Sequence, residues 1–238
     1  MRERLGTALE SPDSKARYVR RLFSTIADRY DFITAFLSYG QDRRWKRRLV
    51  AMAHAQPGVR VLDLACGTGD ITYALQDAGA RAVGLDITER MVELARAKRS
   101  ANRRPAFLVG DMMQLPFADA SFHVVTTGYG IRNVPVIAPA LAEIRRVLRP
   151  GGVLLSLDFN RPSGTALRAI YLTYLTLVGS TLGLVLHGDG DTYRYIPESI
   201  RRFPGAERVC VIARAQGFAS CDWTPVLGGL MAIHRAVR

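Results

Sequence analysis

The stretch that decides the fold is Val59-Arg-Val-Leu-Asp-Leu-Ala-Cys-Gly-Thr-Gly-Asp70. Its apolar run, Val61 to Ala65, is typical of a buried strand, and a glycine-punctuated turn follows before a helical segment that starts at Asp70. Gly67 and Gly69 lack a Cβ, so their backbone can turn sharply and present N–H groups to a ligand. The positive end of the helix favours a negative group there. The turn is therefore a candidate ligand site, and a plain tight turn is the alternative.

A second apolar strand, Arg81 to Ile87, places Asp86 near its carboxyl end. An acid at this position can accept hydrogen bonds from both hydroxyls of a ribose. The dinucleotide pattern requires a third glycine at position 72, and Thr72 occupies it, which disfavours NAD and FAD. The two strands and their loop predict an α/β fold with a nucleoside cofactor at one edge of the sheet.

Asp63-Leu-Ala-Cys-Gly-Thr-Gly69, with Asp86 on the next strand, resembles the cofactor loop of class I S-adenosylmethionine-dependent methyltransferases. The resemblance implies that the loop amides face the methionine part of the cofactor and that Asp86 holds its ribose. Asp111 follows a third strand, Ala106 to Val109, and the resemblance implies that it contacts the adenine; a solvated turn residue is the alternative. The cofactor residues implied are Asp63, Ala65, Gly67, Thr68, Gly69, Asp86, Ile87, Asp111, Met112 and Gly128.

The remaining pattern predicts a Rossmann-like, doubly wound, seven-stranded sheet with an antiparallel C-terminal hairpin. Further strands are expected at 122–127, 153–159, 218–226 and 230–237, and helices at 18–26, 42–52, 88–99, 136–149 and 207–215. At 238 residues the chain suits one domain. Its expected parts are an N-terminal helical cap (1–56), a cofactor-binding core (57–160), a substrate-side insert and lid (161–204) and a C-terminal helix and hairpin (205–238).

Composition excludes several classes of protein. A chain that is 48% hydrophobic and 23% charged is ordinary for a soluble globular protein. Cys66, Cys210 and Cys221 are odd in number and contain no Cys-x-x-Cys pair, which predicts neither a disulfide framework nor a zinc site and suggests a reducing compartment. The four histidines show no ligand spacing, so no metal is expected. Residues 1–10 lack the apolar core of a secretory signal.

The net charge of +12 is concentrated towards the N-terminus. Residues 1–60 hold thirteen Lys and Arg against six Asp and Glu, and the densest run is Arg43 to Arg48. A solvated helix face, an anionic membrane surface and a nucleic acid all explain such a surplus. Charge alone does not choose among them.

Four segments resemble the ubiquinone/menaquinone-biosynthesis C-methyltransferases. The chain departs from the family pattern at Asp42, where His is usual, at Gly128, where Ser is frequent, and at Asp158, which replaces Glu. The resemblance covers the chain from about Tyr18 to its end. The segments are Tyr30 to Lys46, Gly130-Ile-Arg-Asn-Val134, Asp158-Phe-Asn-Arg-Pro162 and Gly188 to Pro204.

The resemblance implies methylation of a ring carbon in a prenylated quinol, with S-adenosyl-L-methionine as donor. Demethylmenaquinol is the preferred ring, and a benzoquinol precursor of ubiquinone and a phytyl-naphthoquinol are alternatives. The Asn/Asp-Pro-Pro-aromatic motif of exocyclic-amine methyltransferases is absent, which speaks against nucleic acid. More distant alternatives are an RNA methyltransferase and a non-enzymatic cofactor-binding scaffold.

A quinol carbon becomes a good nucleophile only when an adjacent hydroxyl loses its proton. We therefore expect Arg132 and Asn133 to stabilise the oxyanion and Tyr193 or Tyr195 to position the ring. An Arg that braces its loop by pairing with a carboxylate is the alternative. The candidates for taking the proton are Asp158, His187 or a water molecule.

Residues 169–186 contain no charge over eighteen positions, the lower limit for a membrane span. Their threonines and glycines favour a buried crossover helix plus an apolar lid. The glycines of Gly188 to Pro204 suggest a mobile lid. Together with the quinol, these features imply a cytoplasmic protein bound peripherally to the inner face of the membrane, and a homo-oligomer is left open.

Overall fold

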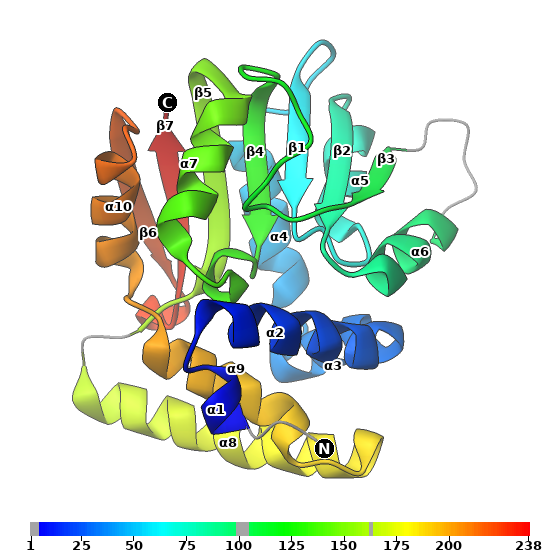
Figure 1. The fold of residues 1–238 in the computed structure, drawn as a ribbon, viewed down its shortest axis with the longest axis vertical. Coiled ribbons are helices and arrows are strands. Elements are labelled where there is room, and N and C mark those ends of the chain that lie inside the picture. Colours follow the sequence, from blue (N-terminus) through cyan, green and yellow to red (C-terminus); the bar gives the residue numbers. More distant parts are fainter. Residues whose placement is uncertain (1–4, 99–104, 162–163) are drawn as a thin grey trace.

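The protein is described by a computed structural model that covers residues 5–98, 105–161 and 164–238 (Figure 1). Its centre is a seven-stranded sheet in the order β3-β2-β1-β4-β5-β7-β6. Strands β1 to β5 are parallel, and β7 runs antiparallel between β5 and β6. This confirms the predicted fold class. The strands are β1 (Arg60–Leu64), β2 (Arg81–Asp86), β3 (Ala106–Val109), β4 (Phe122–Gly128), β5 (Leu148–Phe159), β6 (Ser220–Val226) and β7 (Met231–Val237).

The helices mostly follow the predicted segments, within a few residues at each end. Helix α2 begins earlier than predicted because Ser11 caps it: its hydroxyl accepts the Ser14 N–H, and Pro12 fits the first turn. Arg99 and Pro162, which belong to predicted segments, lie outside the described residues. The helices are α1 (Leu5–Ala8), α2 (Pro12–Ile26), α3 (Tyr30–Leu37), α4 (Asp42–Met52), α5 (Asp70–Asp77), α6 (Glu89–Ala97), α7 (Ile137–Val147), α8 (Thr165–His187), α9 (Asp191–Arg202) and α10 (Ala206–Ala215).

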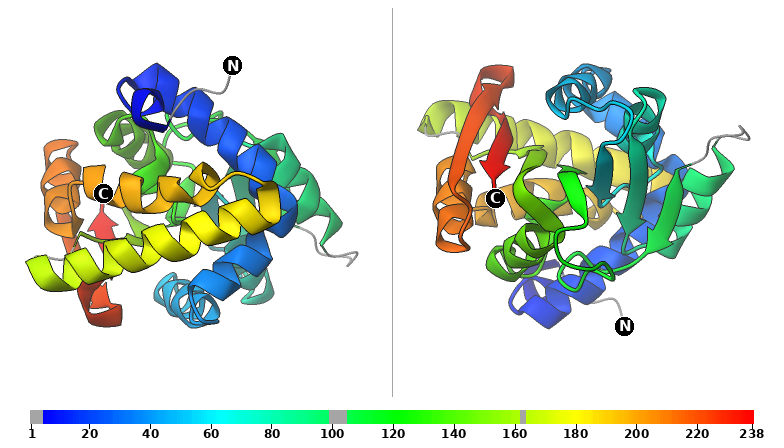
Figure 2. Two further views of the ribbon diagram at one scale, coloured as in Figure 1. Left: turned by 90° about the horizontal axis from the view of Figure 1, so that it is seen from below. Right: turned by 90° about the horizontal axis from the view of Figure 1, so that it is seen from above.

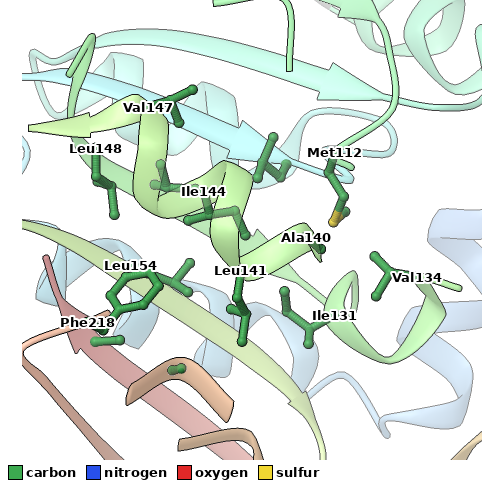
Figure 3. Packing of buried hydrophobic residues seen from close by; sticks show 14 of the residues in the cluster. Met112, Ile131, Val134, Ala140, Leu141, Ile144, Val147, Leu148, Leu154 and Phe218 are labelled. Atoms are coloured by element: carbon green, nitrogen blue, oxygen red, sulfur yellow. The ribbon is translucent and has the colours of Figure 1, made fainter. Parts of the chain in front are cut away.

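Strand β1 is buried on both faces, as the central strand of a parallel sheet must be. Leu62 and Leu64 point to the face covered by α7 and α10, whereas Val61 points to the face covered by α4 and α5. Figure 3 shows the first of these cores, with Leu141 and Ile144 of α7 gathered near Leu154. Helices therefore cover both faces, and the open end of the sheet is left for a third layer.

That third layer lies across the carboxyl ends of the parallel strands (Figure 1). It combines α2 and α3 from the start of the chain with α8 and α9 from its second half, and α8 is outermost when the molecule is seen from below (Figure 2). One buried cluster joins them, because Val19, Leu22 and Ile33 pack together with Tyr193 and Tyr195. We call this helical layer the cap.

One prediction about the cap was wrong, and a second, the mobility of residues 188–204, stays a prediction. The charge-free segment is a single helix, α8, and not a buried crossover helix followed by a lid. Only 22% of its apolar stretch at Arg168–His187 is buried. By length and composition alone, this helix is long and apolar enough to cross a membrane. The segment predicted as a glycine-rich mobile lid is mostly the helix α9, which tolerates Pro197 in its second turn. The glycines form only the short connection before it.

Strand β5 also starts earlier than predicted. Arg149 to Gly152 was expected to end a helix ahead of the strand, but these residues continue β5 from Leu148. Leu148 pairs with Phe122, and the register then shifts before Val124 pairs with Val153. Arg149 to Gly152 therefore lie at the shift in register, between the two pairings.

The expectation that the cysteines form no disulfide was wrong for one pair. Cys210 on α10 and Cys221 on β6 are joined, at a sequence separation of 11 residues. Their pairing depends on α10 packing against β6, which a spacing rule does not detect. Cys66 is free and buried, and burial raises the pKa of its thiol.

Leu49 packs helix α4 against the sheet, and its side chain is fully buried in a cluster with residues of α5 and the strands. We expect Leu49→Ala to lower the free energy of unfolding by about 2–5 kcal/mol, because it removes a buried side chain and leaves a cavity. Arg48→Ala, an exposed change on the same helix, should alter it by less than about 0.5 kcal/mol. Urea denaturation of both variants tests this, and equal effects would mean that α4 is not fastened there.

Candidate active site

The loop after β1 has the sharply turned backbone that its glycines predict. Gly67 and Gly69 have φ angles of +54° and +85°, and Ala65 before them has +51°. A Cβ at Gly69 would lie 2.8 Å from the Phe107 ring, so the residue must be small as well as left-handed. Helix α5 begins directly afterwards, at Asp70. The loop thus brings backbone N–H groups to the carboxyl edge of the sheet.

Asp86 ties this loop to the next strand. Its buried carboxylate accepts hydrogen bonds from the Gly67 N–H at 2.8 Å and the Thr88 N–H at 2.9 Å. Burial raises the pKa of this carboxyl, and the backbone N–H groups partly offset that rise. Its position at the end of β2 is the one predicted for an acid that recognises a ribose.

A cavity of about 740 Å³ lies at these strand ends, and we call it the strand-end cavity. The structure brings seven of the ten predicted cofactor residues into its wall. They are Ala65, Gly67, Asp86, Ile87, Asp111, Met112 and Gly128.

The other three predicted cofactor residues support the loop from outside that wall. Asp63 is fully buried and accepts hydrogen bonds from the Thr72 and Thr126 hydroxyls, at 2.6 and 2.8 Å. The Thr68 hydroxyl donates to Asp31. Gly69 packs against Phe107, as described above. A strand-plus-loop motif cannot separate such supporting residues from those that face the ligand.

A second and larger cavity, of about 1490 Å³, lies between the sheet and the cap; we call it the cap cavity. Its wall is aromatic and aliphatic, with contributions from α2, α3, α8 and α9. Tyr193 and Tyr195 line it, as do Arg132 and Asn133. Burial raises the pKa of Tyr193 to about 12 and that of Tyr195 further, so both hydroxyls stay protonated at neutral pH.

Arg132 lines the cap cavity but is committed to a carboxylate. Its Nε lies 3.3 Å from Asp158 Oδ1, its backbone N–H donates to Asp158 Oδ2 at 2.9 Å, and its guanidinium contacts the Ser199 hydroxyl. The guanidinium also lies 5.0 Å from the centre of the Phe159 ring. This is the bracing arrangement that was the alternative to oxyanion binding, and it places Asp158 in neither cavity wall.

Asn133 lies at the point where the two cavities meet. Its Nδ2 donates to the Tyr129 carbonyl at 2.7 Å, and its Oδ1 accepts from the Tyr195 hydroxyl at 2.9 Å. His187 lies farther away, at the end of α8, with Nε2 2.8 Å from the Tyr193 hydroxyl. It lines neither cavity, and burial and Arg29 lower its pKa.

Sequence reasoning missed three residues of this boundary. Phe23, Tyr30 and Tyr129 line both cavities, as Asn133 does. Tyr30 opens the matched segment Tyr30 to Lys46 and Tyr129 directly precedes Gly130 to Val134, but neither was given a role at the site. For Tyr129 the available signal was its place directly after β4, where the carboxyl end of a strand opens into the crevice.

The sequence profile of the ubiE/COQ5 methyltransferase family matches residues 11–238. The chain belongs to the ubiE/COQ5 methyltransferase family. It is 40% identical over 225 residues to a protein of Paracoccus denitrificans named ubiquinone/menaquinone biosynthesis C-methyltransferase UbiE, covering 92% of this chain and 90% of that one. It is 38% identical over 234 residues, 98% of both chains, to a demethylmenaquinone methyltransferase of a Roseiflexus species.

Solved structures agree on the fold of this ubiE/COQ5 family member. A SAM-dependent methyltransferase from Thermotoga maritima superposes with a TM-score of 0.66 at 21% identity, covering 92% of this chain and 99% of that one. Another from Aquifex aeolicus gives 0.59 at 16%, covering 81% and 88%. At such identities the likeness establishes the architecture, and the family match establishes that the protein is a methyltransferase.

Asp63 gives this methyltransferase a pH-dependent stability. Burial raises the pKa of its carboxyl to about 7, from 3.8. Between about pH 4 and 7 the folded state holds a proton that the unfolded state releases, so the contribution to stability is present below pH 4 and lost as the pH rises to 7.

We expect Asp63→Asn to remove the fall in the free energy of unfolding between pH 4 and 7, which is on the order of a few kcal/mol. The measurement is urea denaturation of wild type and variant from pH 4 to 8, and Asp222→Asn, at an exposed site, is the control. Parallel curves for wild type and Asp63→Asn would contradict the assignment.

Proposed function

We propose that this methyltransferase transfers the methyl group of S-adenosyl-L-methionine to a ring carbon of a prenylated quinol. The observation that carries the proposal is the pair of adjoining cavities. One lies at the strand ends beside Asp86, and the other is larger and has an aromatic and aliphatic wall. Donor and acceptor seated in them would meet at Asn133 and Tyr129, and the large apolar wall suits a fused ring with a hydrocarbon tail.

The residues of the strand-end cavity fit the donor. Gly67 offers backbone to the methionine part, Asp86 offers acceptors to a ribose, and Asp111 with Met112 suits an adenine. When bound, the cofactor supplies an electrophilic methyl group on a sulfonium. The chain's own task is to orient the acceptor ring and to exclude water, which the apolar lining of the cap cavity favours.

The contacts of Arg132 and Asn133 decide how each could act on the acceptor ring. Because Asp158 neutralises Arg132, that guanidinium acts on a quinol oxygen mainly through donors that Asp158 leaves unused. Asn133, held by Tyr129 and Tyr195, is better placed to orient the ring. We retain Arg132, Asn133, Tyr193 and Tyr195 as the acceptor-side residues.

Relatives at similar identity carry names for two rings, so the ring itself is a proposal. We propose demethylmenaquinol, with the benzoquinol precursor of ubiquinone as the second candidate. Both are poor nucleophiles at carbon until a hydroxyl proton is withdrawn, so one site chemistry would serve either.

Methyl-labelled S-adenosyl-L-methionine, incubated anaerobically with reduced short-tail demethylmenaquinol, benzoquinol or bulk RNA, tests the proposal. Label in the extracted naphthoquinol is the expected result. Label only in benzoquinol would reassign the ring, and label only in RNA, or in nothing, would overturn quinol methylation.

Asp86→Asn should weaken donor binding by about tenfold or more, because it removes a charged acceptor, whereas Asp119→Asn, at an exposed site, should leave donor binding unchanged.

We further propose a peripheral position on the cytoplasmic face of an anionic membrane. From Ile170 to Leu184 one face of α8 is exposed and uncharged, and the cap cavity reaches the surface nearby at Tyr39, which is 74% exposed. The net charge of +12 suits anionic lipid. We call this face the α8 stripe, and its exposed residues are Ile170, Thr173, Leu177, Thr181 and Leu184.

Leu177→Glu is expected to reduce binding to vesicles of anionic phospholipid by about tenfold, because it places a charge in the α8 stripe. Val211→Glu, an exposed apolar residue on α10, is the matched control and should bind as the wild type does. Vesicle sedimentation measures both. Equal binding of the two variants would exclude the stripe, and a change in oligomeric state instead would make it a contact between copies.

A further inference from the structure

Tyr129 occupies a tightly constrained position in the site. It lines both cavities, yet only 9% of it is exposed. Its φ angle is +64°, a left-handed conformation that a bulky side chain rarely adopts. Such residues persist where the surroundings fix them, and they cluster at active sites.

Several contacts fix this conformation. The Tyr129 N–H donates to the Leu157 carbonyl at 2.7 Å, and its own carbonyl accepts from Asn133. Gly130 follows, and a Cβ there would lie 2.9 Å from the Ala65 Cβ, so the end of β4 is pressed against the loop after β1. The turn therefore places Tyr129 between the proposed donor and acceptor.

The hydroxyl of Tyr129 is aimed at a buried carboxylate. It donates to Asp42 Oδ1 at 2.6 Å, and Lys46 Nζ lies 2.7 Å from Asp42 Oδ2 and 3.1 Å from Asp70. The side chains of Asp42 and Lys46 are only 6% and 14% exposed. A phenol oxygen that donates its one proton keeps lone pairs to accept another. Tyr129, Asp42 and Lys46 form a chain that leads from the cavity boundary to the half-exposed Asp70.

We propose that Tyr129 receives the hydroxyl proton of the acceptor and relays its own proton to Asp42. The inference rests on the proposed function and names a catalytic residue for it. The substrate O–H bond breaks as its proton joins the Tyr129 oxygen, and the Tyr129 proton moves to Asp42. The freed electron pair enters the ring, whose carbon bonds the methyl group while the methyl–sulfur bond breaks and leaves its pair on sulfur. The ring C–H proton then leaves to water, and Asp42 returns its proton to the ring oxygen along the same path.

The surroundings of Tyr129 suit a neutral relay. Burial and the carboxylate of Asp42 raise its pKa well above the ordinary value, so the hydroxyl keeps its proton until another replaces it. The charged and titratable groups that face it are Asp42 and Lys46 on α4, Tyr30 at the start of α3 and Asp158 on β5. Asp158 is held by Arg132 and His187 lies outside both cavities, so neither earlier candidate has this access.

The test compares Tyr129→Phe, Asp42→Asn and the double variant with the wild type in the labelled-methyl assay. Each single variant should lower kcat by about 10²-fold or more and change KM by less than about threefold, because general base action is lost while the cavity wall remains. The double variant should cost no more than the worse single variant, since the two residues act as a unit. Tyr73→Phe, which removes a buried hydroxyl bonded to the Ala95 carbonyl, is the matched control and should keep wild-type kcat.

A second readout needs no methyl donor. Short-tail naphthoquinol bound anaerobically to the wild type should form its quinolate, seen by ultraviolet absorption, at a lower pH than when bound to Tyr129→Phe or Asp42→Asn. Unchanged kcat in a folded Tyr129→Phe, or the same quinolate titration in all three proteins, would overturn the relay. A wild type that methylates no quinol would instead overturn the proposed function, so the two failures are distinguishable.

Discussion

The ion pair between Arg132 and Asp158 holds the cap onto the sheet. Asp158 belongs to β5, and the Arg132 side chain reaches both it and Ser199 of α9. Lys15 of α2 donates to the Arg132 carbonyl at 3.1 Å and to the Val134 carbonyl at 2.6 Å. One short turn after β4 thus contacts α2, β5 and α9, which lie far apart in the sequence. The pair is fully buried, and removing one partner of such a pair typically costs about 3–5 kcal/mol because the other charge is left unpaired.

This brace explains why the two cavities adjoin. The turn that carries Arg132 also carries Asn133, which reaches back to Tyr129 and across to Tyr195. Burial and the charge of Arg132 lower the pKa of Lys15 to about 8, and the side chains of Arg132 and Asp158 beside it are almost fully buried. Burial of this kind strengthens the polar contacts within the junction. The same residues that close the cap therefore create the environment in which a methyl group could pass between the cavities without competition from water.

The sheet and its cofactor edge could be predicted from local pattern, because a parallel strand is a continuous apolar run and Asp86 stands at its end. The cap could not. Whether Arg132 faces a substrate or a carboxylate depends on Asp158, 26 residues away, and both choices leave the same local sequence. Likewise residues 169–186 of α8 carry no charge, which is equally true of many buried and many exposed helices, and only the packing of α8 against α9 shows which kind it is. The pairing of Cys210 with Cys221 is equally a tertiary fact.

The side chains around Asp42 explain how the fold accommodates this departure from the family pattern. A carboxylate buried on α4 requires compensation, and it receives both the Tyr129 hydroxyl and Lys46. Lys46 in turn is shared with Asp70, the first residue of the helix after the cofactor loop. Helix α4, the strand-end turn and the helix that follows the cofactor loop are thereby joined by one chain of charged hydrogen bonds. In the sequence, Asp42 only departs from the usual motif. In the fold, it connects the proposed donor side with the proposed acceptor side.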